Sequence, residues 1–427
     1  MLIILLSVVS ALRLPIYSAK RPIELVTTGS VPTELGNYFN ELYYLHIQVG
    51  SGGIELSVLI DTGSKYLWLP NTNCETCEHA DNLYNVSASS TSNSLLLNYT
   101  FKYGKASVTG TAVEDTVNIL ADNNTKLQNF PFLSVSNSSN FENFEADGIL
   151  GLSFVDKALV FKNFVEELKS QGKIKVASFS LYLNSNFLDE VVGTNPTSTI
   201  IFGGYDMNFA KENFKFVKID KSSGSWTSGL NKIEVDRMKD GGFQNTGSLN
   251  LNSKRVTFNT GNSKIKVPTI EYNSLMSYIL EKYNCFGLDT EVFCNCPGDY
   301  FFDTNLADFP VLRFYIHDEK NNTEPHFFEL EPEYYVEADS NICRVMLSDF
   351  GENDYIVLGL PFLRRYYTYF DYEKELIGLA PAVKSTLTIY STGNYLAVAS
   401  FALISTVLGY YLNKSRKPAN EAYLRLP

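Results

Sequence analysis

The sequence predicts a mostly-β protein of two similar lobes, followed by one transmembrane helix near the C-terminus. Many segments are short, rich in β-branched and aromatic residues, and separated by Asn, Gly and Ser, which is typical of strands joined by turns. A strand followed by x-Thr-Gly occurs twice, at Asp61-Thr62-Gly63 and at Asn259-Thr260-Gly261. A later apolar-apolar-Gly pattern follows each copy, within residues 147–152 and 355–360. We therefore expect two similar lobes that face each other.

The composition sets broad limits on function. The 427 residues are enough for two lobes that each bury a core. The formal net charge is −12 and the pI is about 5.0, and the body of the chain has no cluster of Lys and Arg. A nucleic-acid partner is therefore not expected. We interpret the scattered acidic residues as a solvated surface rather than as a site for a cationic partner.

The N-terminal end favours entry into the secretory pathway. Residues 1–11 are apolar, too short to span a bilayer and end in small residues, which is typical of a signal peptide. The usual basic residues before the apolar run are missing, and the alternative is a buried first strand. Residues 12–30 then form a short pro-like connector, and the two lobes are expected over residues 31–215 and 216–383.

Local patterns within the lobes predict particular elements. Residues 43–60 contain an alternating strand, a Gly-rich turn and a strand that returns toward Asp61, which predicts a β-hairpin. Two helices are expected over residues 158–171 and 272–283, where apolar residues recur at helical spacing. Gly172 is expected to end the first of these helices.

Six cysteines in a secreted chain favour three disulfides. They are Cys74, Cys77, Cys285, Cys294, Cys296 and Cys343. The Cys74-x-x-Cys77 spacing also suits a redox or zinc pair, but the chain has no second such pair, which favours a small structural loop. The four histidines form no recognisable nucleophile motif, and neither a metal site nor a cofactor is expected.

Five Asn-x-Ser/Thr sequons lie between the two apolar ends of the chain. One sequon often arises by chance, whereas five in a chain with a signal peptide favour a lumenal, glycosylated body. The acceptor residues are Asn85, Asn98, Asn123, Asn137 and Asn321.

The C-terminal region predicts a single membrane span. After a stalk at residues 384–394, residues 395–412 form an 18-residue stretch without charge, which is just long enough to cross a bilayer. Basic residues follow at once and orient the tail, residues 413–427, toward the cytosol. The alternatives are a buried core helix and a lipid anchor added after tail removal. The charged residues after the apolar run disfavour the lipid anchor.

The tail also contains a sequence of the form Tyr-x-x-apolar, at Tyr423-Leu424-Arg425-Leu426. It resembles a sorting signal bound by clathrin adaptors, although so short a motif is common by chance. The expected protein is thus a single-pass type I membrane protein of the secretory pathway, the cell surface or the endolysosomal system.

An ordered set of motifs over roughly residues 35–383 resembles the pepsin-like aspartic proteases. The first active-site loop of that family is matched by Asp61-Thr62-Gly63-Ser64, and the flap that closes over substrate by Tyr103-Gly104 with residues 107–111. Further family motifs are matched by residues 147–152, 201–204 and 357–371. The resemblance implies a bilobal fold with an extended peptide bound in the cleft between the lobes. With a C-terminal span, the layout is similar to the membrane-anchored branch, such as β-secretases.

The resemblance also assigns roles to single residues. In the family two carboxylates share one proton; one activates a water and the other donates toward the scissile carbonyl. Asp61 would be the first catalytic residue, and Asn259 holds the position of the second. Ser64 would orient Asp61, Gly261 would allow close approach of the loops, and Tyr103 and Gly104 would close over the peptide. We expect Asp61 and Asn259 to lie within hydrogen-bond reach, and the disulfide pairs to be Cys74–Cys77, Cys285–Cys294 and Cys296–Cys343, the last resembling a family bridge.

The second loop departs from the family at several positions. Asn259 cannot give or take a proton, and the loss of general acid–base help costs about 10²–10⁴-fold in rate. Asn262 stands where the family has Thr or Ser, Lys264 where an apolar residue is usual, and Leu360 where Asp is frequent. We therefore expect a membrane-anchored family member that binds extended peptide with impaired proteolysis. The alternatives are an active aspartic endopeptidase that uses Asp61 and a purely structural surface protein.

Overall fold

The structure is a computed structural model that describes residues 30–384 with gaps. The gaps are residues 39–40, 121–124, 185–197, 240–241, 250, 283, 289–290, 297, 300–302, 305, 307–308, 319–324 and 340–341. The chain divides into two compact units, Met1–Ser385 and Thr386–Pro427. The expected signal peptide, nearly all of the connector and the stalk, the membrane span and the tail lie outside the described residues. Among the described residues, no helix has the length and apolar character that a membrane span requires.

The first half of the chain forms an eight-stranded sheet. Its expected hairpin is confirmed, with β3 (Leu42–Val49) antiparallel to β4 (Ile54–Asp61). Gly50 and Gly53 have positive φ in the turn between them, a conformation that suits glycine. The strand order is β2-β3-β4-β9-β5-β8-β7-β6. The other members are β2 (Gly36–Tyr38), β5 (Leu67–Pro70), β6 (Asn93–Tyr103), β7 (Ala106–Ile119), β8 (Leu127–Ser139) and β9 (Gly148–Gly151).

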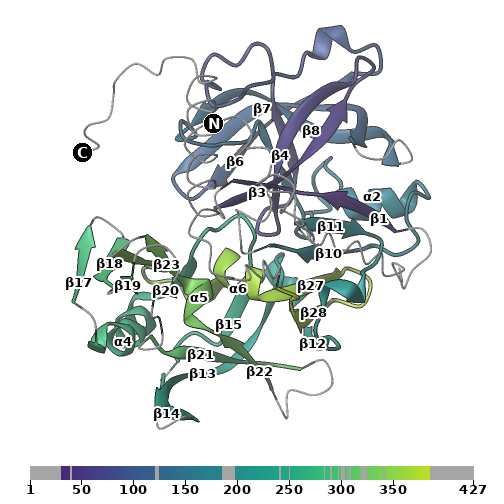
Figure 1. Cartoon of the computed structure of the whole chain (residues 1–427). Coiled ribbons are helices and arrows are strands. Elements are labelled where there is room, and N and C mark those ends of the chain that lie inside the picture. The colour runs from purple at the N-terminus through teal and green to yellow at the C-terminus, as the bar shows by residue number, and fades with distance from the viewer. Residues whose placement is uncertain are drawn as a thin grey trace, which may run out of the picture. The chain divides into compact units, whose positions relative to one another are not determined.

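A six-stranded sheet contains strands from both halves, in the order β1-β11-β10-β27-β28-β12. The strands are β1 (Val31–Glu34), β10 (Ser178–Tyr182), β11 (Thr199–Phe202), β12 (Lys215–Lys218), β27 (Tyr366–Asp371) and β28 (Leu376–Pro381). In Figure 1, β10, β11 and β27 lie between the strands of the first half and those of the second. The lobe boundary expected at residues 215 and 216 falls inside β12, a strand of this shared sheet.

The second half forms another eight-stranded sheet, with the order β22-β21-β13-β15-β26-β16-β25 and with β14 paired to β13. Its strands are β13 (Thr227–Lys239), β14 (Gly242–Ser248), β15 (Arg255–Phe258), β16 (Ile265–Val267), β21 (Val311–Ile316), β22 (His326–Leu330), β25 (Leu347–Asp349) and β26 (Ile356–Leu358). Two smaller sheets contain β17 (Cys285–Leu288), β18 (Glu291–Asn295), β23 (Val336–Asp339) and β24 (Ile342–Val345), and β19 (Gly298–Asp299) with β20 (Asp303–Thr304).

The helix expected over residues 158–171 is shorter than predicted, as α2 spans Phe164–Ser170. It begins late because Asn163 caps its N-terminus: Asn163 Oδ1 accepts a hydrogen bond from the backbone N–H of Glu166 at 2.9 Å. The Asn163 side-chain amide also donates to the Ser153 carbonyl, which holds the cap in place. Gly172 follows the helix with a φ of +69°, as expected of a residue that ends a helix.

The helix expected over residues 272–283 starts three residues early. α4 spans Thr269–Ile279 and continues into a 3-10 turn, η5 (Leu280–Lys282). Pro268 precedes it directly, and proline favours the first turn of a helix. The other short helices are α5 (Pro332–Tyr335), α6 (Leu360–Arg365), η1 (Val86–Ala88), η3 (Met207–Phe209) and η4 (Lys221–Ser223).

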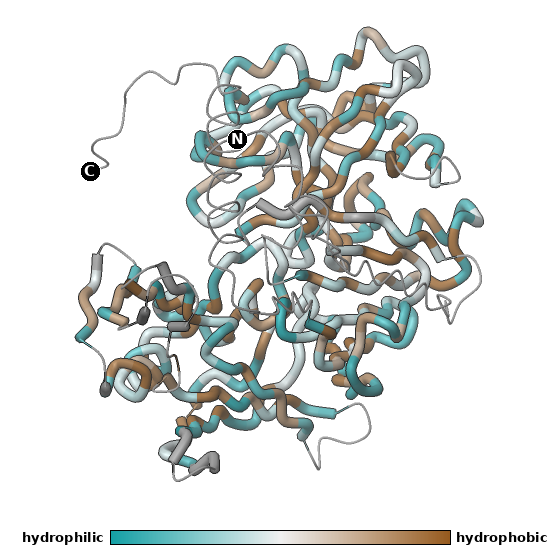
Figure 2. The backbone as a smooth tube through the Cα atoms, in the orientation of Figure 1, coloured by the Kyte–Doolittle hydropathy of each residue, from teal (hydrophilic) through white to brown (hydrophobic). Residues whose placement is uncertain are grey.

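The largest hydrophobic cluster contains residues of both halves of the described chain, and two smaller clusters lie apart from it. Figure 2 shows hydrophobic residues along the strands and hydrophilic ones at many of the turns. Trp226, fully buried, joins the halves: its ring packs on Phe154 and Phe370, and its Nε1 donates to the Leu152 carbonyl at 2.8 Å. The rings that meet at this indole come from segments far apart in the sequence, so the core fixes the two halves to one another.

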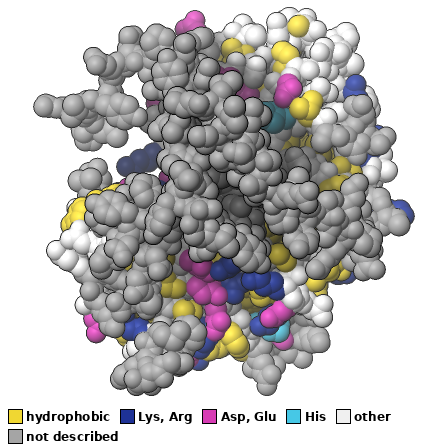
Figure 3. Space-filling view, viewed as in Figure 1, with side chains coloured by type: hydrophobic (Ala, Val, Ile, Leu, Met, Phe, Trp, Pro, Cys, Tyr) yellow, Lys and Arg dark blue, Asp and Glu magenta, His cyan; other side chains and the backbone are white. Residues whose placement is uncertain are grey.

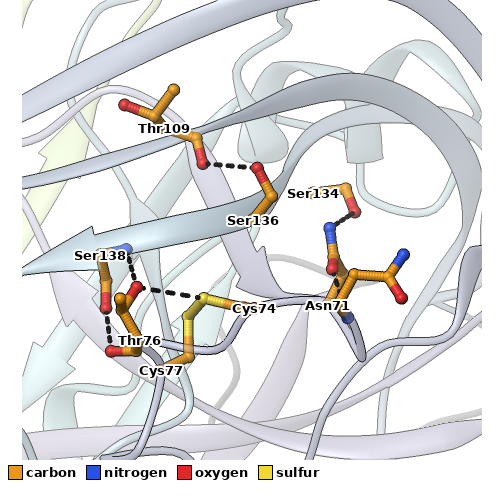
Figure 4. The surroundings of a disulfide bond; sticks show 9 residues. Asn71, Cys74, Thr76, Cys77, Thr109, Ser134, Ser136 and Ser138 are labelled. Carbon is orange, nitrogen blue, oxygen red and sulfur yellow. Dashed lines mark hydrogen bonds between the residues drawn. A yellow bond between two sulfur atoms is a disulfide. The ribbon is translucent and has the colours of Figure 1, made fainter.

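The three expected disulfides, Cys74–Cys77, Cys285–Cys294 and Cys296–Cys343, are confirmed. The Cys74–Cys77 disulfide closes a small loop (Figure 4). Thr76 inside this loop binds β8 twice: its hydroxyl accepts from the Ser138 N–H, and its carbonyl accepts from the Ser138 hydroxyl. The loop is therefore attached to the sheet of the first half.

Candidate active site

The two x-Thr-Gly loops occupy equivalent places in the two halves. Asp61 ends β4, which runs parallel to β9 and pairs at this residue with Gly151. Asn259 follows β15, which runs parallel to β26, and its N–H donates to the Leu358 carbonyl at 3.0 Å. Each loop thus leaves a strand that lies beside the later apolar-apolar-Gly segment, which confirms the repeat inferred from the sequence.

Reciprocal hydrogen bonds between the two threonines join the loops. The N–H of Thr62 donates to Thr260 Oγ1 at 3.0 Å, and the N–H of Thr260 donates to Thr62 Oγ1 at 3.0 Å. Each hydroxyl also donates to a carbonyl of the opposite half, Thr62 to Phe258 and Thr260 to Ile60. Both threonines are buried. Four hydrogen bonds shielded from water therefore fix the distance and orientation of the two loops.

The glycines of the loops let the two side chains approach the opposite backbone. A Cβ atom on Gly63 would lie 2.0 Å from Asn259 Nδ2, and one on Gly261 would lie 2.4 Å from Asp61 Oδ1. The Gly63 N–H donates to Asp61 Oδ1 at 2.8 Å, and the Gly261 N–H donates to Asn259 Oδ1 at 2.7 Å. The Asp61 carboxyl and the Asn259 amide therefore both contact Gly63 and Gly261, in matching positions.

Asp61 is an isolated buried carboxyl. Its burial raises its pKa above the ordinary value, because the charged form loses the solvation of bulk water. Backbone N–H groups offset part of this rise, among them that of Gly63, which donates to Asp61 Oδ1. The Ser64 hydroxyl oxygen is buried but has no hydrogen-bond partner among the described residues, so the orienting role expected of Ser64 stays a prediction. Asn259 contributes a neutral amide, so the pair holds at most one negative charge and has no second carboxyl with which to share a proton.

The β6–β7 hairpin contains the segment that resembles the flap of the family. Tyr103 ends β6 and pairs with Ala106, and Gly104 in the turn has a φ of +60°, which favours glycine. The Tyr103 ring lies 6.5 Å from Trp68 and 6.0 Å from Phe141, centroid to centroid. Burial raises the pKa of Tyr103, and the negative charge of Asp61 acts in the same direction. Tyr103 is therefore close to the carboxyl that the resemblance assigned to catalysis.

The three unusual residues of the second loop are accommodated by the fold. Lys264 Nζ donates to Glu291 Oε1 in an ion pair between largely buried side chains. The Asn262 carbonyl accepts from the Leu360 N–H at 2.8 Å, and the Leu360 side chain is fully buried. These substitutions are compatible with an intact loop, although none of them supplies a second titratable acid next to Asp61.

A hollow of about 410 Å³ lies next to the Gly261 loop and is lined by residues of both halves. Its lining residues are Glu41, Leu42, Leu59, Asn143, Phe144, Glu145, Gly261 and Ser263. Arg344 Nη2 forms an ion pair with Glu41 at 2.6 Å. In Figure 3, a group of Lys and Arg side chains lies beside Asp and Glu side chains in the lower middle of the view. No group of three or more potential metal ligands occurs in the described part of the chain.

Sequence reasoning missed the linking role of Thr62 and Thr260. Thr62 directly follows Asp61, and Thr260 directly follows Asn259. This matching position in the two copies of the repeat is the sequence signal that could have indicated their role. It also missed Lys266 on β16, whose position relative to the site depends on strand register. The lining residues of the hollow come from separate segments and carry no common motif.

Comparison with known sequences agrees with this geometry. The sequence model of the eukaryotic aspartyl protease family matches residues 42–382, and the chain therefore belongs to this family. Plasmepsin IV of Plasmodium falciparum is 28% identical over 359 residues, which cover 82% of this chain and 71% of that protein. Pepsin A of Sus scrofa is 27% identical over 364 residues, with 83% and 84% covered. Rhizopuspepsin-4 of Rhizopus niveus is 28% identical over 361 residues, with 83% and 81% covered.

Proposed function

We propose that this protein binds an extended peptide over the Asp61 and Asn259 loops, and that its proteolytic activity is strongly impaired. One observation carries the proposal: the side chain in the second position is the amide of Asn259. Its Oδ1 accepts from the Gly261 N–H, and its Nδ2 lies against Gly63. The amide therefore preserves the shape of a two-carboxylate site without its proton chemistry.

Peptide binding is supported by the parts of the site that do not depend on the second carboxyl. The reciprocal bonds of Thr62 and Thr260 hold the loops together, and the flap places Tyr103 near Asp61. The hollow beside Gly261 offers space for side chains of a bound segment. These features position a ligand whether or not hydrolysis follows.

An active endopeptidase that uses Asp61 is the second candidate, and the burial of Asp61 favours it. The carboxyl is 6% exposed and its pKa is raised by desolvation, which suits a general base. The Gly63 N–H orients it. A single carboxylate can polarise a water, although no second acid is then present to donate a proton toward the scissile carbonyl.

Peptide cleavage at acid pH separates the two candidates. The full-length protein is compared with its Asn259→Asp, Asn259→Asp/Asn262→Thr and Asp61→Asn variants on a fluorogenic peptide library. We expect wild type to match Asp61→Asn, and the restored pair to gain about 10²–10⁴-fold, the usual size of general acid–base help. Wild-type cleavage as fast as that of Asn259→Asp would instead establish the active endopeptidase.

We further propose that the protein is a glycosylated type I membrane protein, anchored by residues 395–412. The exposed side chains of the sequon residues Asn98 and Asn137 support N-linked glycosylation. Two measurements test the orientation: in sealed vesicles added protease should remove the tail and spare the body, and glycosidase should shift the mobility of the body. If the Tyr423–Leu426 motif binds a clathrin adaptor, Tyr423→Ala raises the amount of protein at the cell surface. Unchanged surface levels would remove that partner.

A further inference from the structure

The register of the second-half sheet places Lys266 on the same face as the candidate active site. Lys266 of β16 pairs with Val357 of β26, and Val357 pairs with Thr257 of β15. Residues paired across neighbouring strands direct their side chains to one face of a sheet. Asn259 follows two residues after Thr257, so the alternation of side chains puts Asn259 on that face as well.

The opposite face of the same strands is the apolar core. The neighbours of Lys266 along its strand, Ile265 and Val267, are fully buried, as are Phe258 and Leu358 on the adjacent strands. Lys266 itself is only partly buried. It therefore extends from the core sheet on the side of Asn259 rather than into the interior.

Lys266 has no carboxylate partner among the described residues. Its Nζ lies over the Phe350 ring, 5.7 Å from the ring centroid. Lys264, two residues earlier, is by contrast paired with Glu291. Burial lowers the pKa of Lys266, and the charge of Asp61 opposes this shift. The ammonium group thus lies within electrostatic range of the Asp61 carboxyl, partly desolvated and without an ion pair of its own.

We propose that Lys266 binds a carboxylate side chain, Asp or Glu, of the peptide held over the two loops. This inference rests on the peptide binding proposed above and names its specificity. A partly buried ammonium that lacks a counter-ion gains most from an anionic ligand, because a charge-assisted hydrogen bond is about twice as strong as a neutral one. Successive peptide residues advance by about 3.3 Å in an extended segment, so one position of the ligand will carry the preference.

The test measures peptide affinity, not cleavage, by fluorescence polarisation with the full-length protein. Labelled peptides from a pool that binds wild type are resynthesised in Glu and Gln versions at each position in turn. At one position we expect wild type to prefer Glu over Gln by about tenfold, a typical effect of one hydrogen bond to a charged group. Lys266→Met should abolish this ratio, Lys266→Arg should retain most of it, and Lys266→Glu should reverse it. The exposed Lys254 of the same half provides a matched control, Lys254→Met, which should leave the ratio unchanged.

The pH dependence separates recognition from an indirect effect through Asp61. The Glu preference should disappear as the pH falls through the carboxyl pKa of the peptide, about 4.3. If Lys266→Met changes the binding of Glu and Gln peptides equally at every pH, Lys266 acts on the site and not on the ligand, and the proposal is wrong. Peptide binding without Glu–Gln discrimination at any position overturns the proposal but leaves peptide binding intact. Failure of every peptide to bind wild type overturns both.

Discussion

Replacing Thr62 with valine tests whether the reciprocal hydrogen bonds hold the two loops together. Valine has nearly the shape of threonine but lacks the hydroxyl. The substitution removes the acceptor of the Thr260 N–H and the donor to the Phe258 carbonyl. Thr62 is 0% exposed, so water cannot replace either partner without opening the core.

The expected cost follows from these two groups. A buried polar group that loses its partner costs about 1–3 kcal/mol, so two such groups cost about 2–6 kcal/mol. That is a large share of the roughly 5–15 kcal/mol by which a folded protein is stable. Thr260→Val should have a similar cost, and the double variant should lose less than the sum, because the two side chains belong to one network.

Urea unfolding followed by tryptophan fluorescence measures the effect. The chain has two tryptophans, Trp68 and Trp226, and both are fully buried. The matched control is Thr109→Val, since the Thr109 hydroxyl bonds that of Thr100 in an exposed hydrogen bond. Its free energy of unfolding should change by less than about 0.5 kcal/mol. An equally small change for Thr62→Val would refute the role assigned to these bonds.

Three further predictions concern the same framework. Burial raises the pKa of Asp61 above its unfolded value of 3.8. Between pH 3.8 and the folded pKa, the folded protein therefore keeps a proton that the unfolded chain loses. The stability of the wild type should fall as the pH rises through this window. Asp61→Asn should gain stability relative to wild type across this window in pH-dependent denaturation, and a difference independent of pH would contradict the burial argument. Removing Cys296–Cys343, which closes a separation of 47 residues, should lower the free energy of unfolding by about 4 kcal/mol. Removing Cys74–Cys77, with a separation of 3, should lower it by about 1.6 kcal/mol. Calorimetry of the two Cys→Ser double variants measures both losses, and the reverse order would contradict this prediction. Gly63→Ala should destabilise by about 1–3 kcal/mol or more, because its Cβ would meet Asn259 Nδ2, whereas Gly52→Ala, with no atom within 4 Å of its Cβ, should change the unfolding midpoint little.

Much of the site was predictable because its signals are local in the sequence. An alternating strand that ends in Asp-Thr-Gly specifies both the strand and the place where the carboxyl leaves the sheet, and β4 ends at Asp61. The second copy identified Asn259 in the same way. Tyr103-Gly104 was identified by its resemblance to the flap of the family, and the structure has a hairpin turn there. The start of α2 was missed because the apolar spacing continued upstream, whereas Asn163 caps the helix from outside that pattern.

The sequence by itself determined the mostly-β class, the repeat, the Asp61–Asn259 mismatch and the chemistry that this mismatch excludes. These depend on residue type and on spacing within one segment. Tertiary structure alone decided that Thr62 bonds Thr260 across 198 residues of chain, and that Lys266 lies in a row with Val357 and Thr257. Register between distant strands is set by how whole sheets pack, and a single lysine in a short strand looks in sequence like any solvated charge. The place of Lys266 on the same side of the sheet as Asn259 exists only after folding.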